Sequence, residues 1–149
     1  MRGVNAAPTA SARPPVLRRL GVPLAALAAV AVPTTYIALV DPNAPGHYPI
    51  CPFLAATGWW CPGCGGLRCV HALVHGDLSG ALHDNAPAVL LFAVLSVLWV
   101  RWVWAAATGG PAPRLALGVR RWVLVALLLL VFTVVRNLPI GAGLAPPLV

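Results

Sequence analysis

Three apolar runs with almost no charge inside them limit what this chain can fold into. They span Val22–Val40, Ala86 to about Ala107, and Trp122–Val135. The first two are long enough to cross about 30 Å of hydrocarbon at about 1.5 Å per residue. Because 60% of the 149 residues are hydrophobic and only 9% are charged, the chain has too little polar surface for a soluble fold. We therefore expect an all-α integral membrane protein with about three transmembrane helices.

The runs differ in how regular they are. Pro33 lies inside the first run and predicts a kink. Arg101 lies near the end of the second run, where its side chain can extend to the lipid headgroups. The third run covers only about 21 Å. It spans the membrane if it extends toward Val119 and Ile140, and otherwise it forms a re-entrant or interfacial helix.

The arginines predict the orientation. The 41–85 segment contains one arginine and three aspartates. Most arginines precede the first run or lie between the second and third, with Arg101 just inside the end of the second: Arg2, Arg13, Arg18, Arg19, Arg114, Arg120 and Arg121. The positive-inside rule therefore places the N-terminus and the 108–121 loop in the cytoplasm, and the 41–85 segment and C-terminus outside. The alternative for the first run is a cleaved signal peptide, although its leader is long.

Composition also bears on the origin, the domains and the partners. All ten basic residues are arginines, and Ala, Gly, Pro and Val are abundant, which suggests a GC-rich bacterial genome and a multi-pass protein of the bacterial cell membrane. Residues 1–16 read as a disordered cytoplasmic tail, and residues 17–149 as a single membrane domain. The net charge of +7 does not indicate nucleic acid, because the arginines cluster at the ends of apolar runs. The expected partners are the lipid bilayer and other membrane proteins.

All four cysteines lie in the 41–85 segment: Cys51, Cys61, Cys64 and Cys69. Cys61 and Cys64 form a C-P-G-C turn that brings two sulfurs within reach of each other or of one metal ion. Glycines at 63, 65 and 66 permit close backbone approach. Leu67–His75 then has helical spacing, and Asp77 is placed to cap a second short helix that continues through Leu82.

These residues resemble a family of uncharacterised bacterial membrane proteins, domain of unknown function 2752. The resemblance covers roughly residues 41–100, and its motifs occur here in order: Cys51-Pro52-Phe53, Thr57-Gly58, Cys61-Pro62-Gly63-Cys64-Gly65, Arg68, Gly76-Asp77 and Asn85. The chain departs from the family pattern in having Gly66-Leu67 before the arginine, in placing Pro87 one position late after Asn85, and in carrying Cys69. The resemblance implies a multi-helix membrane protein and no established activity.

Three interpretations of the cysteines compete. The first is a disulfide among Cys51, Cys61 and Cys64 that staples the outer loop, since cysteines on the oxidising side of a membrane tend to pair. The second is a metal site of the zinc type, in which Cys61 and Cys64 join His71 and His75 as ligands. The two histidines lie one helical turn apart, and Cys51 can replace one of them as a ligand. The third is thiol–disulfide exchange at the C-x-x-C pair.

No pattern elsewhere in the sequence indicates catalysis, and Glu is absent, which removes a common general acid or base. The sequence therefore favours a non-catalytic structural or accessory membrane component with a disulfide-stapled motif. The alternative is a metal-binding or thiol-redox membrane protein. We expect Cys51, Cys61 and Cys64 to converge and Cys69 to pack separately. We also expect Arg136, directly after the third run, to extend to the headgroups or to pair with Asp77 or Asp84.

Overall fold

The structure, a computed structural model, describes residues 15–114 and 118–145, and within these ranges it contains helices and no strand. The helices are α1 (Val16–Leu39), α2 (Pro52–Thr57), α3 (Gly66–Val74), α4 (Leu78–Thr108), α5 (Val119–Arg136) and the 3-10 helix η1 (Pro139–Leu144). The all-α prediction is confirmed. The predicted 1–16 tail lies outside the described residues except for its last two, where α1 begins at Val16.

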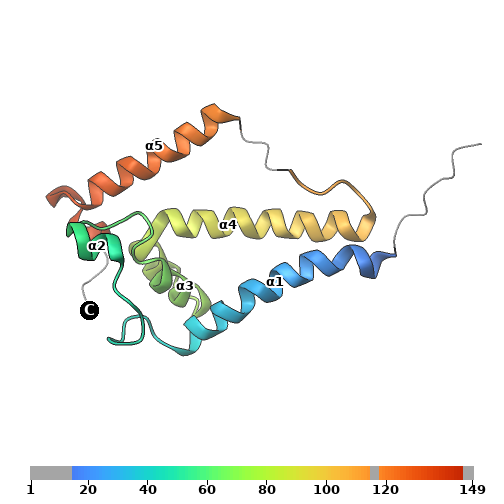
Figure 1. Cartoon of the computed structure of the whole chain (residues 1–149), viewed down its shortest axis with the longest axis horizontal. Coiled ribbons are helices and arrows are strands. Elements are labelled where there is room, and N and C mark those ends of the chain that lie inside the picture. Colours follow the sequence, from blue (N-terminus) through green and yellow to red (C-terminus); the bar gives the residue numbers. More distant parts are fainter. Residues whose placement is uncertain (1–14, 115–117, 146–149) are drawn as a thin grey trace, which may run out of the picture.

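Two helices, α1 and α4, are long and apolar enough to cross a membrane. They approach each other at the N-terminal end of α1 and diverge toward α3, which packs against both (Figure 1). Near the converging end, the Trp99 indole N–H donates to the carbonyl of Pro23 at 3.1 Å. The remaining apolar side chains of both helices are largely exposed, as expected of helices whose surroundings are lipid rather than water.

The start of α4 contains two successive helix caps. Asp77 accepts a hydrogen bond from the Gly80 N–H at 2.9 Å, which is the cap that the sequence predicts. At Asn85 the backbone leaves the helical region (φ −163°, ψ 86°), and its side-chain oxygen accepts from the Ala88 N–H at 3.0 Å. Pro87 then falls in the first turn of the renewed helix, where no backbone N–H is needed. This explains why a proline one position late is tolerated.

The last long helix, α5, stands apart from α1 and α4 over most of its length and contacts η1 (Figure 1). Its apolar side chains are exposed from Val119 to Val131. It has 18 residues, and Arg120, Arg121 and Arg136 lie among them. The predicted third run is thus a helix, while its crossing of a membrane stays a prediction.

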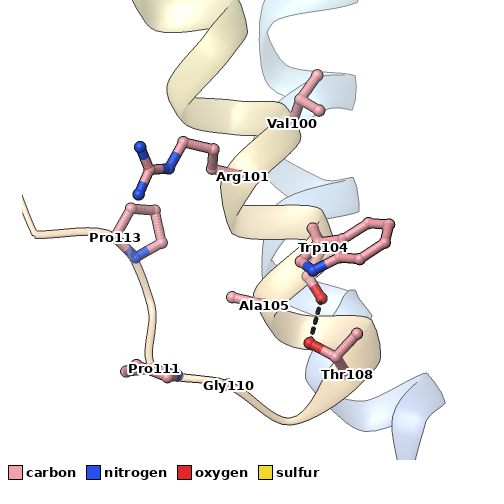
Figure 2. A pocket seen from close by; sticks show the side chains of 8 residues that line it. All are labelled: Val100, Arg101, Trp104, Ala105, Thr108, Gly110, Pro111 and Pro113. Atoms are coloured by element: carbon pink, nitrogen blue, oxygen red, sulfur yellow. Dashed lines mark hydrogen bonds between the residues drawn. The ribbon is translucent and has the colours of Figure 1, made fainter.

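At the far end of α4, a shallow hollow of about 470 Å³ lies between the helix and the proline-rich chain that follows it. Figure 2 shows Arg101 directed toward Pro113, on the side of α4 away from α1. Trp104 is exposed beside it, and the Thr108 hydroxyl donates to the Trp104 carbonyl at 2.8 Å. This end of α4 therefore combines a cationic and an aromatic side chain, a pairing typical of the lipid–water boundary.

Candidate metal centre

The three motif cysteines flank two short helices. Cys51 directly precedes α2, and Cys61 and Cys64 form the turn before α3. The turn is closed by backbone hydrogen bonds from Cys64 N–H to Cys61 C=O (3.2 Å) and from Gly66 N–H to Gly63 C=O (3.0 Å). Gly65 has φ +83°, a left-handed conformation that disfavours any side chain. The motif glycine is therefore what allows α3 to begin immediately after Cys64.

The sulfurs of these cysteines form one cluster. The Sγ atoms of Cys51 and Cys61 are 3.6 Å apart, those of Cys61 and Cys64 are 3.1 Å apart, and all three lie within 4.8 Å of one another. This confirms that the three cysteines converge. The disulfide staple is not supported, because a disulfide bond needs about 2.05 Å between sulfurs and all four cysteines are free thiols.

Two buried polar side chains hold the carbonyls of the C-P-G-C turn. The Asn85 amide, 2% exposed, donates to the carbonyls of Pro62 (2.9 Å) and Cys64 (3.0 Å). The Arg136 guanidinium, 1% exposed, donates to the carbonyls of Cys61 (3.1 Å) and Cys64 (3.2 Å). Because Asn85 and Arg136 supply hydrogen bonds to these carbonyls, the turn keeps its shape without any bond between the thiols.

Arg136 joins the end of α5 to the cysteine turn. Its second terminal nitrogen donates to the Leu144 carbonyl at 3.0 Å, and the guanidinium lies 4.9 Å from the Phe132 ring centre. The neighbouring Asn137 exchanges two hydrogen bonds with the Trp60 backbone, at 2.8 and 2.9 Å. The predicted link between the third run and the motif segment exists. The predicted carboxylate partner was wrong, because the guanidinium has carbonyl oxygens as its partners.

Two of the three thiols have pKa values shifted in opposite directions. The Leu54 N–H, at the start of α2, lowers the pKa of the Cys51 thiol against the opposing effect of desolvation. Burial raises the pKa of Cys64 to about 12, and the neighbouring Cys61 thiol adds to this. Thiolates at this spacing repel one another, so only a bound cation allows all three to ionise together.

The other predicted ligands lie elsewhere. Nδ1 of His71 is 2.8 Å from the Ile37 carbonyl, and its Nε2 is 3.8 Å from an Asp41 oxygen. Nδ1 of His75 is 2.8 Å from the His71 carbonyl, and the two imidazole rings lie with their centres 4.2 Å apart. The structure thus divides the predicted Cys/His set: the cysteines gather at the start of α3, and the histidines face the end of α1.

Cys69 packs separately, as expected. It is fully buried in α3, where its Sγ is 3.8 Å from the Asn85 carbonyl. Burial raises the pKa of its thiol. It is therefore a core residue of the α3–α4 contact and takes no part in the sulfur cluster.

The remaining motif residues surround the cluster. Gly76 ends α3 with φ +79°, and Asp77 caps α4. Arg68 interacts electrostatically with Asp84 and lines a hollow of about 720 Å³ beside the cysteines. Cys51, Cys64, Tyr48, Leu54 and Trp60 also line this hollow, together with the glycines of the turn. Sequence reasoning missed the hollow and the role of Asn137, and it gave Arg136 a carboxylate partner in place of the carbonyls of the turn.

The comparison with known families agrees with this geometry. A family model described as "Protein of unknown function (DUF2752)" matches residues 51–99. This match confirms the resemblance to that family over residues 51–99. The DUF2752 match begins at the first clustered cysteine and ends within α4, so it covers the sulfur cluster and Asn85 but excludes α5. No curated protein and no solved structure matches the chain significantly.

Proposed function

We propose that this chain is an integral membrane protein that binds a thiophilic divalent cation, of the zinc class, through Cys51, Cys61 and Cys64. The observation that carries the proposal is the convergence of three free thiols within 4.8 Å. Tetrahedral zinc with bonds of about 2.3 Å holds its sulfur ligands about 3.8 Å apart. The observed spacings of 3.1 and 3.6 Å lie close to that value.

The charge of Arg136 supports the same conclusion. A fully buried guanidinium with no carboxylate partner is costly, and its Nε has no hydrogen-bond partner among the described residues. One of its terminal NH₂ groups donates to the carbonyls of both Cys61 and Cys64. Three thiolates with one divalent cation carry a net charge of minus one, which this guanidinium neutralises. Three neutral thiols would leave the buried charge uncompensated.

The membrane part of the proposal rests on α1 and α4, the two helices long and apolar enough to span. With the N-terminus in the cytoplasm, Arg101 and Trp104 lie at the inner boundary and the cysteine cluster lies at the outer one. The proposed location is the bacterial cell membrane, with α5 as a third span that returns to the outer side. In this arrangement Arg136 meets the cluster at the level of the outer headgroups.

Thiol–disulfide exchange is the second candidate, and one observation favours it. The Cys61 and Cys64 sulfurs are only 3.1 Å apart. Against it, burial holds the Cys64 pKa at about 12, whereas redox cysteines of the C-x-x-C type have lowered pKa values. The third convergent thiol also has no role in a two-cysteine exchange.

The test is metal loading of the full chain in detergent. Cobalt(II) or cadmium(II) titrated into reduced protein should give a thiolate-to-metal charge-transfer absorption that saturates at one ion per chain. Cys51→Ser, Cys61→Ser and Cys64→Ser should each weaken binding at least tenfold. Cys69→Ser is the matched control and should keep both the absorption and the stoichiometry. Absence of the charge-transfer band in correctly folded wild-type protein overturns the proposal.

A further inference from the structure

The sulfur cluster provides three donors where a closed zinc site has four. Every Cys, His and Asp of the sequence lies within residues 15–114 and 118–145, and Glu is absent. Among these described residues, only Cys51, Cys61 and Cys64 bring ligand atoms together. The Cys69 sulfur faces the Asn85 carbonyl, and His71 faces α1. Structural zinc sites use four protein ligands, whereas reactive sites use three and keep one position open.

The open position has space in front of it. Cys51 and Cys64 both line the hollow of about 720 Å³, so a cation held between them borders that space. Residues of the 42–50 chain, including Ala44 and Tyr48, also line the hollow, as do Leu54 and Trp60. A volume of this size accepts a small organic molecule, and its walls are mainly apolar.

The charge balance of the site indicates which kind of fourth ligand the metal takes. The three thiolates, one divalent cation and Arg136 sum to zero. An anionic fourth ligand adds an uncompensated charge beside buried groups, whereas a neutral ligand leaves the balance intact. Arg68, the other cation lining the hollow, interacts with Asp84. The interior of the site therefore favours a neutral nitrogen or oxygen donor.

We infer that the metal centre keeps an exchangeable fourth coordination position facing this hollow, and that this position takes a neutral nitrogen or oxygen donor carried by a small, largely apolar molecule. The inference rests on the proposed function, because it requires the cation. It assigns the hollow as a substrate or ligand site and makes the centre a reactive one rather than a structural staple.

The experiment uses the cobalt(II)-loaded full chain in detergent, with imidazole as the neutral probe and azide as the anionic one. Imidazole should shift the cobalt d–d absorption in a saturable manner, and azide should bind at least tenfold more weakly. The thiolate charge-transfer band should persist throughout, because the cysteines stay bound. Ala44→Trp, which narrows the hollow, should weaken imidazole binding at least tenfold and leave cobalt stoichiometry unchanged.

Ala56→Trp is the matched control, since Ala56 is exposed on α2 and does not line the hollow. It should bind imidazole as the wild type does. Charge-transfer absorption with d–d bands that neither probe alters would overturn the open position and leave the proposed function standing. Tighter binding of azide than of imidazole would overturn the neutral-donor assignment. Loss of the charge-transfer band itself would instead be a failure of the proposed function.

Discussion

Cys64 is the most buried thiol of the cluster, and its environment opposes ionisation. Its side chain is 7% exposed, and its pKa is raised to about 12 by burial and by the neighbouring thiols. The raised value stabilises the metal-free fold at all pH values below the ordinary thiol range, and this contribution is lost as the pH rises toward 12. A divalent cation reverses this preference for the protonated thiol, because it binds the thiolate and displaces the proton.

Metal affinity should therefore rise with pH. Below its pKa of about 12 Cys64 holds its proton, so metal binding must displace at least that proton and the association constant should rise by about one log unit or more per pH unit. Competition with a chromophoric chelator at several pH values measures this slope. An affinity that is flat over these pH values would contradict a protonated thiol as the starting state.

The Asn85 side chain both caps a helix and holds the cysteine turn. It caps the renewed helix of α4 through Ala88 and donates to the carbonyls of Pro62 and Cys64. Asn85→Ala should lower the free energy of unfolding by about 3 kcal/mol, because it removes a cap and leaves two buried carbonyls short of donors. Thermal or denaturant unfolding in detergent measures the loss.

The matched control for that substitution is Asn43→Ala. Asn43 also makes local hydrogen bonds, to Asp41, but in an exposed loop. Its replacement should change the free energy of unfolding by less than about 0.5 kcal/mol. Equal effects of the two substitutions would mean that Asn85 does not hold the turn.

At the scale of elements, the sequence predicts what depends on neighbours in the chain. The helical spacing of Leu67–His75, the Asp77 cap and the convergence of three cysteines within 14 residues all follow from local turn and helix geometry. The two histidines show the limit of prediction from local geometry. Their spacing places them on one face of α3, yet only packing decides that this face meets the end of α1 at Ile37.

Arg136 shows the same limit over a longer distance. Its hydrogen bonds join residue 136 to residues 61 and 64, and no local pattern encodes a contact of that separation. A carboxylate partner was the natural expectation for a buried guanidinium. The carbonyls of the cysteine turn take that place because α5 ends directly beside the turn, where Asn137 contacts Trp60.

Arg136→Ala should therefore destabilise the protein by about 3 kcal/mol or more, since it leaves three carbonyls without their charged donor. Arg114→Ala, in the exposed connection before α5, should change the free energy of unfolding by less than about 0.5 kcal/mol. Arg136→Lys should recover only part of the loss, because an ammonium lacks the planar fork of donors. Thermal unfolding in detergent compares the three variants. Equal tolerance of the two alanine substitutions would mean that Arg136 does not hold the cysteine turn.

In the whole molecule, α1 and α4 diverge toward α3 (Figure 1). The cysteine cluster lies just before α3, and Arg136 at the end of α5 donates hydrogen bonds to its turn. The apolar surface of all three long helices is exposed. Two of these helices, α1 and α4, are long and apolar enough to cross a membrane, and lipid around them would account for the exposure. The sequence predicts this division between apolar helices and a more polar cysteine end, because charge is scarce inside the apolar runs and the motif residues lie between them.

The arginine distribution predicts the membrane topology. Alkaline phosphatase fused after Asp41 should be active, and the same reporter fused within residues 109–114 should be inactive, because the enzyme folds only outside the cytoplasm. The paired fusions control for expression. Activity of the second fusion alone would invert the orientation and place the metal centre in the cytoplasm.

The central claim is that three clustered thiols hold a divalent cation instead of a disulfide. Native mass spectrometry of the full chain, purified from membranes without chelator, tests this in a single spectrum. We expect one zinc-class ion per chain with all four cysteines reduced, and the same ion in Cys69→Ser but not in Cys61→Ser. A metal-free chain whose mass is lower by the hydrogens lost to a disulfide among Cys51, Cys61 and Cys64 would contradict it.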